Sequence, residues 1–102
     1  MPEMTFTVRW PDGGVSTCYS PSLVMHDHLE VGTDYPLAEF VERTHTALRI
    51  ASDRVEARYG MPCSRAAAQT REIDLHAAPF AASGGRVRVL SMQPDHPTGA
   101  PR

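Results

Sequence analysis

The sequence predicts an α+β domain in which helices pack on one face of a three-stranded, mainly antiparallel sheet. Three observations support this prediction. Apolar and polar residues alternate on both sides of a turn near residue 12, apolar residues recur every three or four positions in residues 36–60, and alternation returns in residues 86–92. Helices on one side of a sheet bury all of these apolar stripes in the simplest way. The expected order is strand, strand, short helix, long helix, helix, strand.

Residues 5–10 and 15–20 are predicted to form a β-hairpin. Its loop is expected to be the two-residue turn Asp12-Gly13, because this dipeptide tolerates the positive φ that such turns need. The turn predicts a register with the cross-strand pairs Trp10–Val15, Val8–Thr17 and Phe6–Tyr19 on one apolar face. That face would meet the long helix at Leu48, Val55 and Tyr59. The opposite face would then contain Cys18, beside Thr7.

The segment between the hairpin and the long helix is less regular. Ser20-Pro21-Ser22 is expected to end the second strand, since proline has no N–H for the ladder. It could also begin a short helix through Leu29, with Ser20 as the cap and Pro21 at the first helical position. The stretch LVMHDHL has no clear period, so the sequence leaves the conformation of residues 21–29 open. Residues 32–34 are expected to form a loop.

The clearest helix pattern covers residues 36–60. Asp34 and Pro36 mark its start, and Gly60 followed by Pro62 marks its end. Its apolar stripe is predicted to consist of Leu37, Val41, Thr44, Leu48, Ala51, Val55 and Tyr59. The pattern therefore predicts an amphipathic helix of about six turns.

A second helix is predicted from residue 64 to residue 78, with Ser64 as its cap and Pro79 near its end. Its thinner apolar face would consist of Ala66, Ala67, Thr70, Ile73 and Ala77. The turn Ser83-Gly84-Gly85 leads into a third strand, RVRVLSM, in which valines alternate with Arg86 and Arg88. Residues 93–102 contain three prolines and no large apolar residue, so we expect a disordered tail after a single domain at 1–92.

Composition limits the classes of function. The chain has 102 residues, 41% of them hydrophobic, and a net charge of −2, and all ten basic residues are arginine. The arginines alternate with acidic residues, which disfavours nucleic-acid binding. No apolar run reaches the roughly 18 residues of a membrane span, and the N-terminus lacks the pattern of a signal peptide. We therefore expect a cytoplasmic protein that does not bind membranes.

Two cysteines and two histidines are the candidate chemical groups. Cys63 precedes the second helix, where a thiol can have a lowered pKa and act as a nucleophile, and Cys18 could do so if its face formed a pocket. The residues themselves favour the simpler interpretation, in which both are ordinary structural residues with free thiols. His26 and His28 would share a face if extended, and could then bind zinc or iron with Cys18 as the third ligand. In a helix, residues two apart point away from each other.

Other residues give no clear site. His45 and His76 are expected on helix surfaces, and Asp12 is explained by the turn. The sequence contains no GxSxG, P-loop, Rossmann or HExxH motif. We therefore assign no confident catalytic residue, and we expect neither a cofactor nor a metal.

Several motifs together resemble a known bacterial family. These motifs are MPEMTFTVRWPDG, CYSPS, YPLAEFV and ALRIASDRVEARYG leading to CS, within residues 1–80. They resemble the nitrogen-starvation-response proteins of mycobacteria and cyanobacteria. The resemblance implies a gene cluster that also encodes a nitrilase, a radical SAM protein, an acetyltransferase-like protein, an AIR-synthase-like protein and a flavoprotein. It implies a role in nitrogen or nitrile metabolism and assigns no catalytic residue.

These observations favour a non-catalytic accessory protein that binds a partner enzyme of the nitrilase cluster or a pathway intermediate. The alternatives are a small cysteine-dependent enzyme or metal-binding protein, and a nitrogen-responsive regulator. A small sheet also leaves edges and one face free, so a homodimer formed by sheet extension or across that face is a further expectation.

Overall fold

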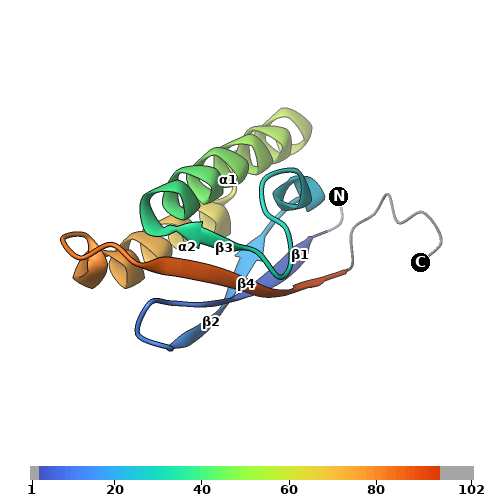
Figure 1. The fold of residues 1–102 in the computed structure, drawn as a ribbon. Helices are drawn as coiled ribbons and strands as arrows, with labels where there is room; N and C mark the ends of the chain where they lie inside the picture. Colours follow the sequence, from blue (N-terminus) through green and yellow to red (C-terminus); the bar gives the residue numbers. More distant parts are fainter. Residues whose placement is uncertain (1–2, 95–102) are drawn as a thin grey trace.

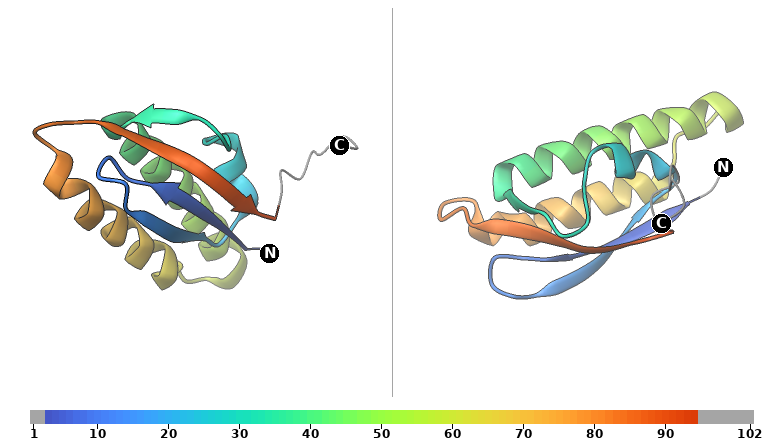
Figure 2. Two further views of the ribbon diagram at one scale, coloured as in Figure 1. Left: turned by 60° about the horizontal axis from the view of Figure 1, so that its bottom comes forward. Right: turned by 45° about the vertical axis from the view of Figure 1, so that its right-hand side comes forward.

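Two helices cover one face of a four-stranded antiparallel sheet (Figures 1 and 2). The structure is a computed structural model that describes residues 3–94. The strands are β1 (Met4–Arg9), β2 (Val15–Ser20), β3 (Asp34–Pro36) and β4 (Arg86–Gln93), in the spatial order β2-β1-β4-β3. The helices are α1 (Leu37–Tyr59) and α2 (Ser64–Ala77), with short 3₁₀ helices η1 (Leu23–Asp27) and η2 (Ala78–Phe80). The predicted α+β class and helices on one face are confirmed.

The sheet has four strands, so the prediction of three was wrong. The additional strand is β3, which overlaps the last residue of the predicted loop 32–34 and the first residue of the predicted helix, and which pairs with the start of β4. It has only three residues and ends in Pro36, which cannot donate to a ladder and is tolerated at an edge. Tyr35 is nevertheless buried, and Leu37 N–H donates to Gly85 O at 3.0 Å. These contacts join the start of α1 to the sheet.

The hairpin loop has three residues, and the predicted register was therefore wrong by one residue. Trp10 N–H donates to Gly14 O at 2.7 Å, and Gly13 N–H donates to Trp10 O at 2.8 Å. Gly13 has a φ of +90°, which suits the last position of a three-residue loop. Asp12 supports the turn by accepting Gly14 N–H at 2.9 Å.

The corrected register turns the side chains of β2 over, because a shift of one residue exchanges the two faces of a strand. Phe6 pairs with Cys18 and Val8 with Ser16. Cys18 is consequently buried under the helices, and its predicted place on the opposite face was wrong. Val15 and Tyr19 lie on the face of the sheet away from the helices.

The two main helices agree with the predicted ranges. Gly60, with a φ of +82°, ends α1, and Cys63 rather than Ser64 is the N-cap of α2. The largest fully buried hydrophobic side chains come from the sheet, η1 and both helices: Phe6, Val8, Met25, Phe40, Leu48, Ile73, Val87 and Val89. Trp10 packs edge-on against Phe40, with ring centroids 5.5 Å apart.

Tyr59 does not join this core, contrary to the prediction. It lies in the last turn of α1, which projects away from the sheet, and it is 62% exposed (Figure 2). Tyr19 is also outside the core, as a result of the register. The apolar stripe of α1 therefore ends near Ala51, which is fully buried.

Within residues 20–29, Leu23–Asp27 form the 3₁₀ helix η1. Ser22 is its cap and accepts Val24 N–H at 3.2 Å, so the predicted helix start at Ser20 and Pro21 was two residues too early. Ser20 instead donates its hydroxyl to Ser22 O at 2.7 Å, inside the core. β4 includes Gln93, the first residue of the predicted tail, and residues 95–102 lie outside the described residues. Within residues 3–94, neither helix has the length and apolar content that crossing a membrane requires.

Replacing Phe40 by alanine is expected to lower the free energy of unfolding by about 3–5 kcal/mol, because the buried ring leaves a cavity. Tyr59→Ala should change the free energy of unfolding by only about 0.5 kcal/mol, as is usual for exposed positions. Urea unfolding followed by circular dichroism measures both changes. Equal losses would contradict the placement of Tyr59 outside the core.

Candidate functional site

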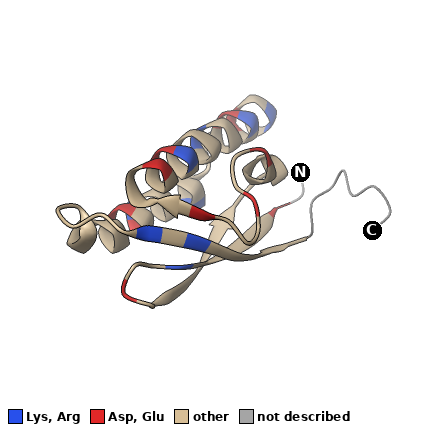
Figure 3. Cartoon of the chain, viewed as in Figure 1, with Lys and Arg blue, Asp and Glu red and all other residues tan. Residues whose placement is uncertain are grey.

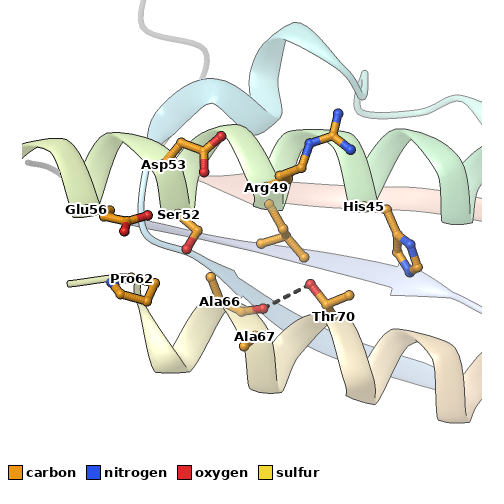
Figure 4. Close-up of a pocket in the computed structure, with 10 residues that line it drawn as sticks. His45, Arg49, Ser52, Asp53, Glu56, Pro62, Ala66, Ala67 and Thr70 are labelled. Atoms are coloured by element: carbon orange, nitrogen blue, oxygen red, sulfur yellow. Dashed lines mark hydrogen bonds between the residues drawn. The ribbon is translucent and has the colours of Figure 1, made fainter.

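A groove runs along the outer surface of the helical layer, between α1 and α2 (Figure 4). It forms because α2 turns small residues toward α1, and its volume is about 440 Å³. Its floor consists of Leu48, Ala66 and Ala67. Its polar lining consists of His45, Arg49, Ser52, Asp53, Glu56 and Thr70. The groove therefore combines an apolar floor with hydrogen-bonding walls.

One end of the groove contains a histidine–aspartate pair. His45 Nε2 lies 2.7 Å from Asp74 Oδ1, and both side chains are partly exposed. A carboxylate in this position orients the imidazole ring and fixes which nitrogen faces the groove. The sequence placed His45 on a helix surface correctly. Its pairing with a residue 29 positions away depends on the packing of α1 against α2 and could not be predicted.

The two hydroxyl groups of the groove contact backbone groups. Thr70 donates its hydroxyl to Ala66 O at 3.0 Å, and Ser52 Oγ accepts Cys63 N–H at 3.3 Å. Among the described residues, the charged side chains of Arg49, Asp53 and Glu56 have no ion-pair partner. The groove therefore contains charged groups that are available to bind a small polar molecule.

The two candidate cysteines occupy different environments. Cys18 is 3% exposed, and burial, with a smaller contribution from the charge of Glu72, raises the pKa of its thiol to about 12. The thiolate is the reactive form, so Cys18 stays protonated and unreactive at neutral pH. Cys63 is half-buried at the N-cap of α2, next to the groove residue Pro62. Both cysteines are free thiols.

The two candidate histidines do not form a metal site with Cys18. His26 is buried in η1, and its Nε2 lies 3.0 Å from Pro94 O. His28 caps the end of η1 and lines a separate hollow with Glu39, Glu42 and Arg43. Within the part of the chain that the structure describes, no three His, Cys, Asp or Glu side chains lie close enough to hold a metal ion. The extended conformation that would have placed both histidines on one face is not present here.

A second surface, at the hairpin end of the molecule, is apolar. We call it the apolar end surface and define it as Val15, Leu75, Pro79 and Phe80 around a hollow of about 300 Å³, whose lining also includes the polar residues Asp12, Ser16 and His76. Val15 is 59% exposed and Leu75 is 69% exposed. Trp10 also lines the hollow, donating its indole N–H to Ser16 Oγ at 3.0 Å and stacking on His76 at 5.4 Å.

This surface was not predicted, although the sequence contains one signal of it. Leu75 follows Ile73 by two residues, so it is out of phase with the buried face of α2. The phase of Leu75 therefore predicts an exposed leucine, and its position beside Val15 at one hollow appears only in the structure. Val15 was assigned to the core by the predicted register, which concealed its exposure.

A protein-family model described as nitrogen starvation-induced protein NitG matches residues 5–92. No curated protein and no solved structure matches the chain.

Only Cys63 is expected to react with DTNB in the folded protein at pH 8, because the pKa of Cys18 is about 12. Wild type should release one equivalent of thionitrobenzoate quickly and the second only in urea. The Cys63→Ser variant should lose the fast phase, and Cys18→Ser should keep it. A fast phase that persists in Cys63→Ser would contradict the buried position of Cys18.

Proposed function

Because the chain belongs to the NitG family of nitrogen starvation-induced proteins, we propose that it is a non-catalytic accessory protein of a nitrile-linked nitrogen pathway that binds a partner enzyme. The family supports a role in the response to nitrogen starvation. The link to nitriles and the choice of partner rest on the resemblance to proteins of nitrilase gene clusters. The partner would be one of the enzymes of such a cluster.

The observation that supports partner binding best is the apolar end surface. Single exposed apolar residues are common on protein surfaces and need no explanation. Here Val15 and Leu75 instead border the same hollow, and Phe80 and Pro79 extend its apolar lining. Contiguous apolar surface around a hollow is typical of protein-interaction sites. A hollow with a tryptophan in its lining could receive an apolar side chain of the partner.

The surface is built on rigid elements. Val15 begins β2, and Leu75 lies in the last turn of α2. Trp10 is held by Phe40, His76 and Ser16. A partner would therefore meet a preformed surface and would not need to order it, which lowers the entropic cost of binding.

Leu75→Glu is expected to weaken partner binding without unfolding the protein, because it places a charge at an exposed position of the contact. Met61→Glu is the matched control, since Met61 is 71% exposed in the turn between the helices and does not line the hollow. The measurement is a pull-down of each tagged variant from nitrogen-starved cells, with quantification of the nitrilase, radical SAM protein and other cluster enzymes.

Wild type and Met61→Glu should recover at least one cluster enzyme, and Leu75→Glu should recover about tenfold less, as expected for a contact at the centre of an interface. Recovery of no cluster enzyme by wild type would contradict the accessory function. Equal recovery by Leu75→Glu would contradict the choice of surface.

The groove supports a second candidate function, which is binding of a pathway intermediate. The supporting observation is the His45–Asp74 pair beside uncommitted charged groups above an apolar floor. Such a combination of apolar area and a few polar groups is typical of small-molecule sites.

Filling the groove should block such binding. Ala67→Phe would occupy the groove floor, whereas Ala68→Phe is a matched control because Ala68 is exposed and does not line the groove. NMR titration with small nitriles, amides and carboxylates should shift the signals of His45 and Thr70 in wild type and Ala68→Phe only. Absence of shifts in wild type would contradict this second function.

A further inference from the structure

Three arginines lie on one end of the sheet face that points away from the helices. Arg9 of β1 pairs with Arg88 of β4. Their chain neighbours Val8, Val87 and Val89 are fully buried on the helical side. Since side chains alternate along a strand, Arg9 and Arg88 point to the opposite face, and Arg86 does so as well. We call Arg9, Arg86 and Arg88 the arginine stripe; Figure 3 shows basic segments of β1 and β4 at this end of the sheet.

The positive charge of the stripe is largely uncompensated. Arg88 donates to Asp34 across the β3–β4 pair, with 3.2 Å between Nη1 and Oδ2. Among residues 3–94, the exposed side chains of Arg9 and Arg86 have no ion-pair or hydrogen-bond partner. Like charges directly opposite on neighbouring strands destabilise a sheet. A bound anionic group would relieve this repulsion. The whole chain has a net charge of −2, so the positive charge of the stripe is a local feature of this face.

The arginine stripe is continuous with the apolar end surface. Val15 pairs with Arg9, Arg9 pairs with Arg88, and Arg88 pairs with Asp34. This row crosses β2, β1, β4 and β3 with one residue from each strand. The apolar contact at Val15 and the basic contact at Arg9 are therefore adjacent positions of one surface.

We infer that the arginine stripe binds an acidic segment of the partner protein, next to the apolar side chain that the apolar end surface receives. This inference rests on the proposed function, because it specifies the chemistry of the same partner. Guanidinium groups hold carboxylates through two parallel hydrogen bonds, which suits a chain whose basic residues are all arginine. Nucleic acid is disfavoured, since the affinity for a strand grows with the number of phosphates neutralised, and the stripe offers three arginines, of which Arg88 is already paired with Asp34.

The test uses fluorescence anisotropy at low salt with a fluorescein-labelled oligoglutamate peptide and, separately, a single-stranded DNA oligonucleotide of equal charge. The double variant Arg9→Gln/Arg86→Gln removes the unpaired charges of the stripe. The matched control Arg58→Gln/Arg71→Gln removes the same charge from exposed positions on the helices that do not line the groove. Sedimentation at two protein concentrations detects binding of a second copy of this chain instead.

Wild type should bind the peptide more tightly than the DNA. The stripe variant should weaken peptide binding about tenfold and the control by less than about twofold, because close charge pairs set the affinity. Three outcomes would overturn the inference: no peptide binding, equal losses in both variants, or tighter binding of DNA. Dimerisation that the stripe variant abolishes would also overturn it, in favour of a second copy.

The pull-down separates this inference from the proposed function. If the stripe variant recovers cluster enzymes as well as wild type and Leu75→Glu does not, the accessory function is supported. The inference that the stripe binds an acidic segment of the partner is then contradicted. If wild type recovers no cluster enzyme but the peptide result holds, the accessory function fails and the stripe remains an acidic-segment site.

Discussion

The three-residue hairpin loop is the constraint on which the surfaces of this protein depend. Trp10 and Gly14 pair across it, and Gly13 takes the positive φ that closes it. This loop places Cys18 in the core and Val15 on the outside. A loop one residue longer would exchange the two faces of β2. The exposed valine beside Arg9 therefore follows from the turn as much as from the residue itself.

The helices could be predicted from the sequence because their signals are local and agree with one another. Apolar spacing, Gly60 and the prolines give the range of α1 to within one residue at its start. The sequence predicts that a hairpin forms here but does not predict its register. Asp12-Gly13 fits either a two-residue or a three-residue loop, and the hydrogen bonds between the two strands determine which one forms. β3 could not be predicted because three residues ending in proline show no alternation, and its pairing partner lies about fifty residues later.

The candidate surfaces were harder to predict than the elements that form them. His45 and Asp74 meet only because α1 packs on α2, and Arg9 meets Arg88 only because β1 pairs with β4. The sequence shows these residues as ordinary members of charged faces. Leu75 is different, since the sequence alone shows that it lies two residues after Ile73 and therefore away from the buried face of α2. The sequence favoured the two cysteines, but Cys18 is buried in the core, and Cys63 is partly buried against it at the start of α2.

The groove and the arginine stripe lie on opposite layers of the molecule. The groove is on the outer side of the helices, and the stripe is on the uncovered face of the sheet. The core between them is closely packed around Phe40 and Val89. A partner on the sheet face would therefore leave the groove open, and a small molecule in the groove would leave the sheet face free. This separation means that the two proposed sites can be occupied at the same time without competing for the same surface.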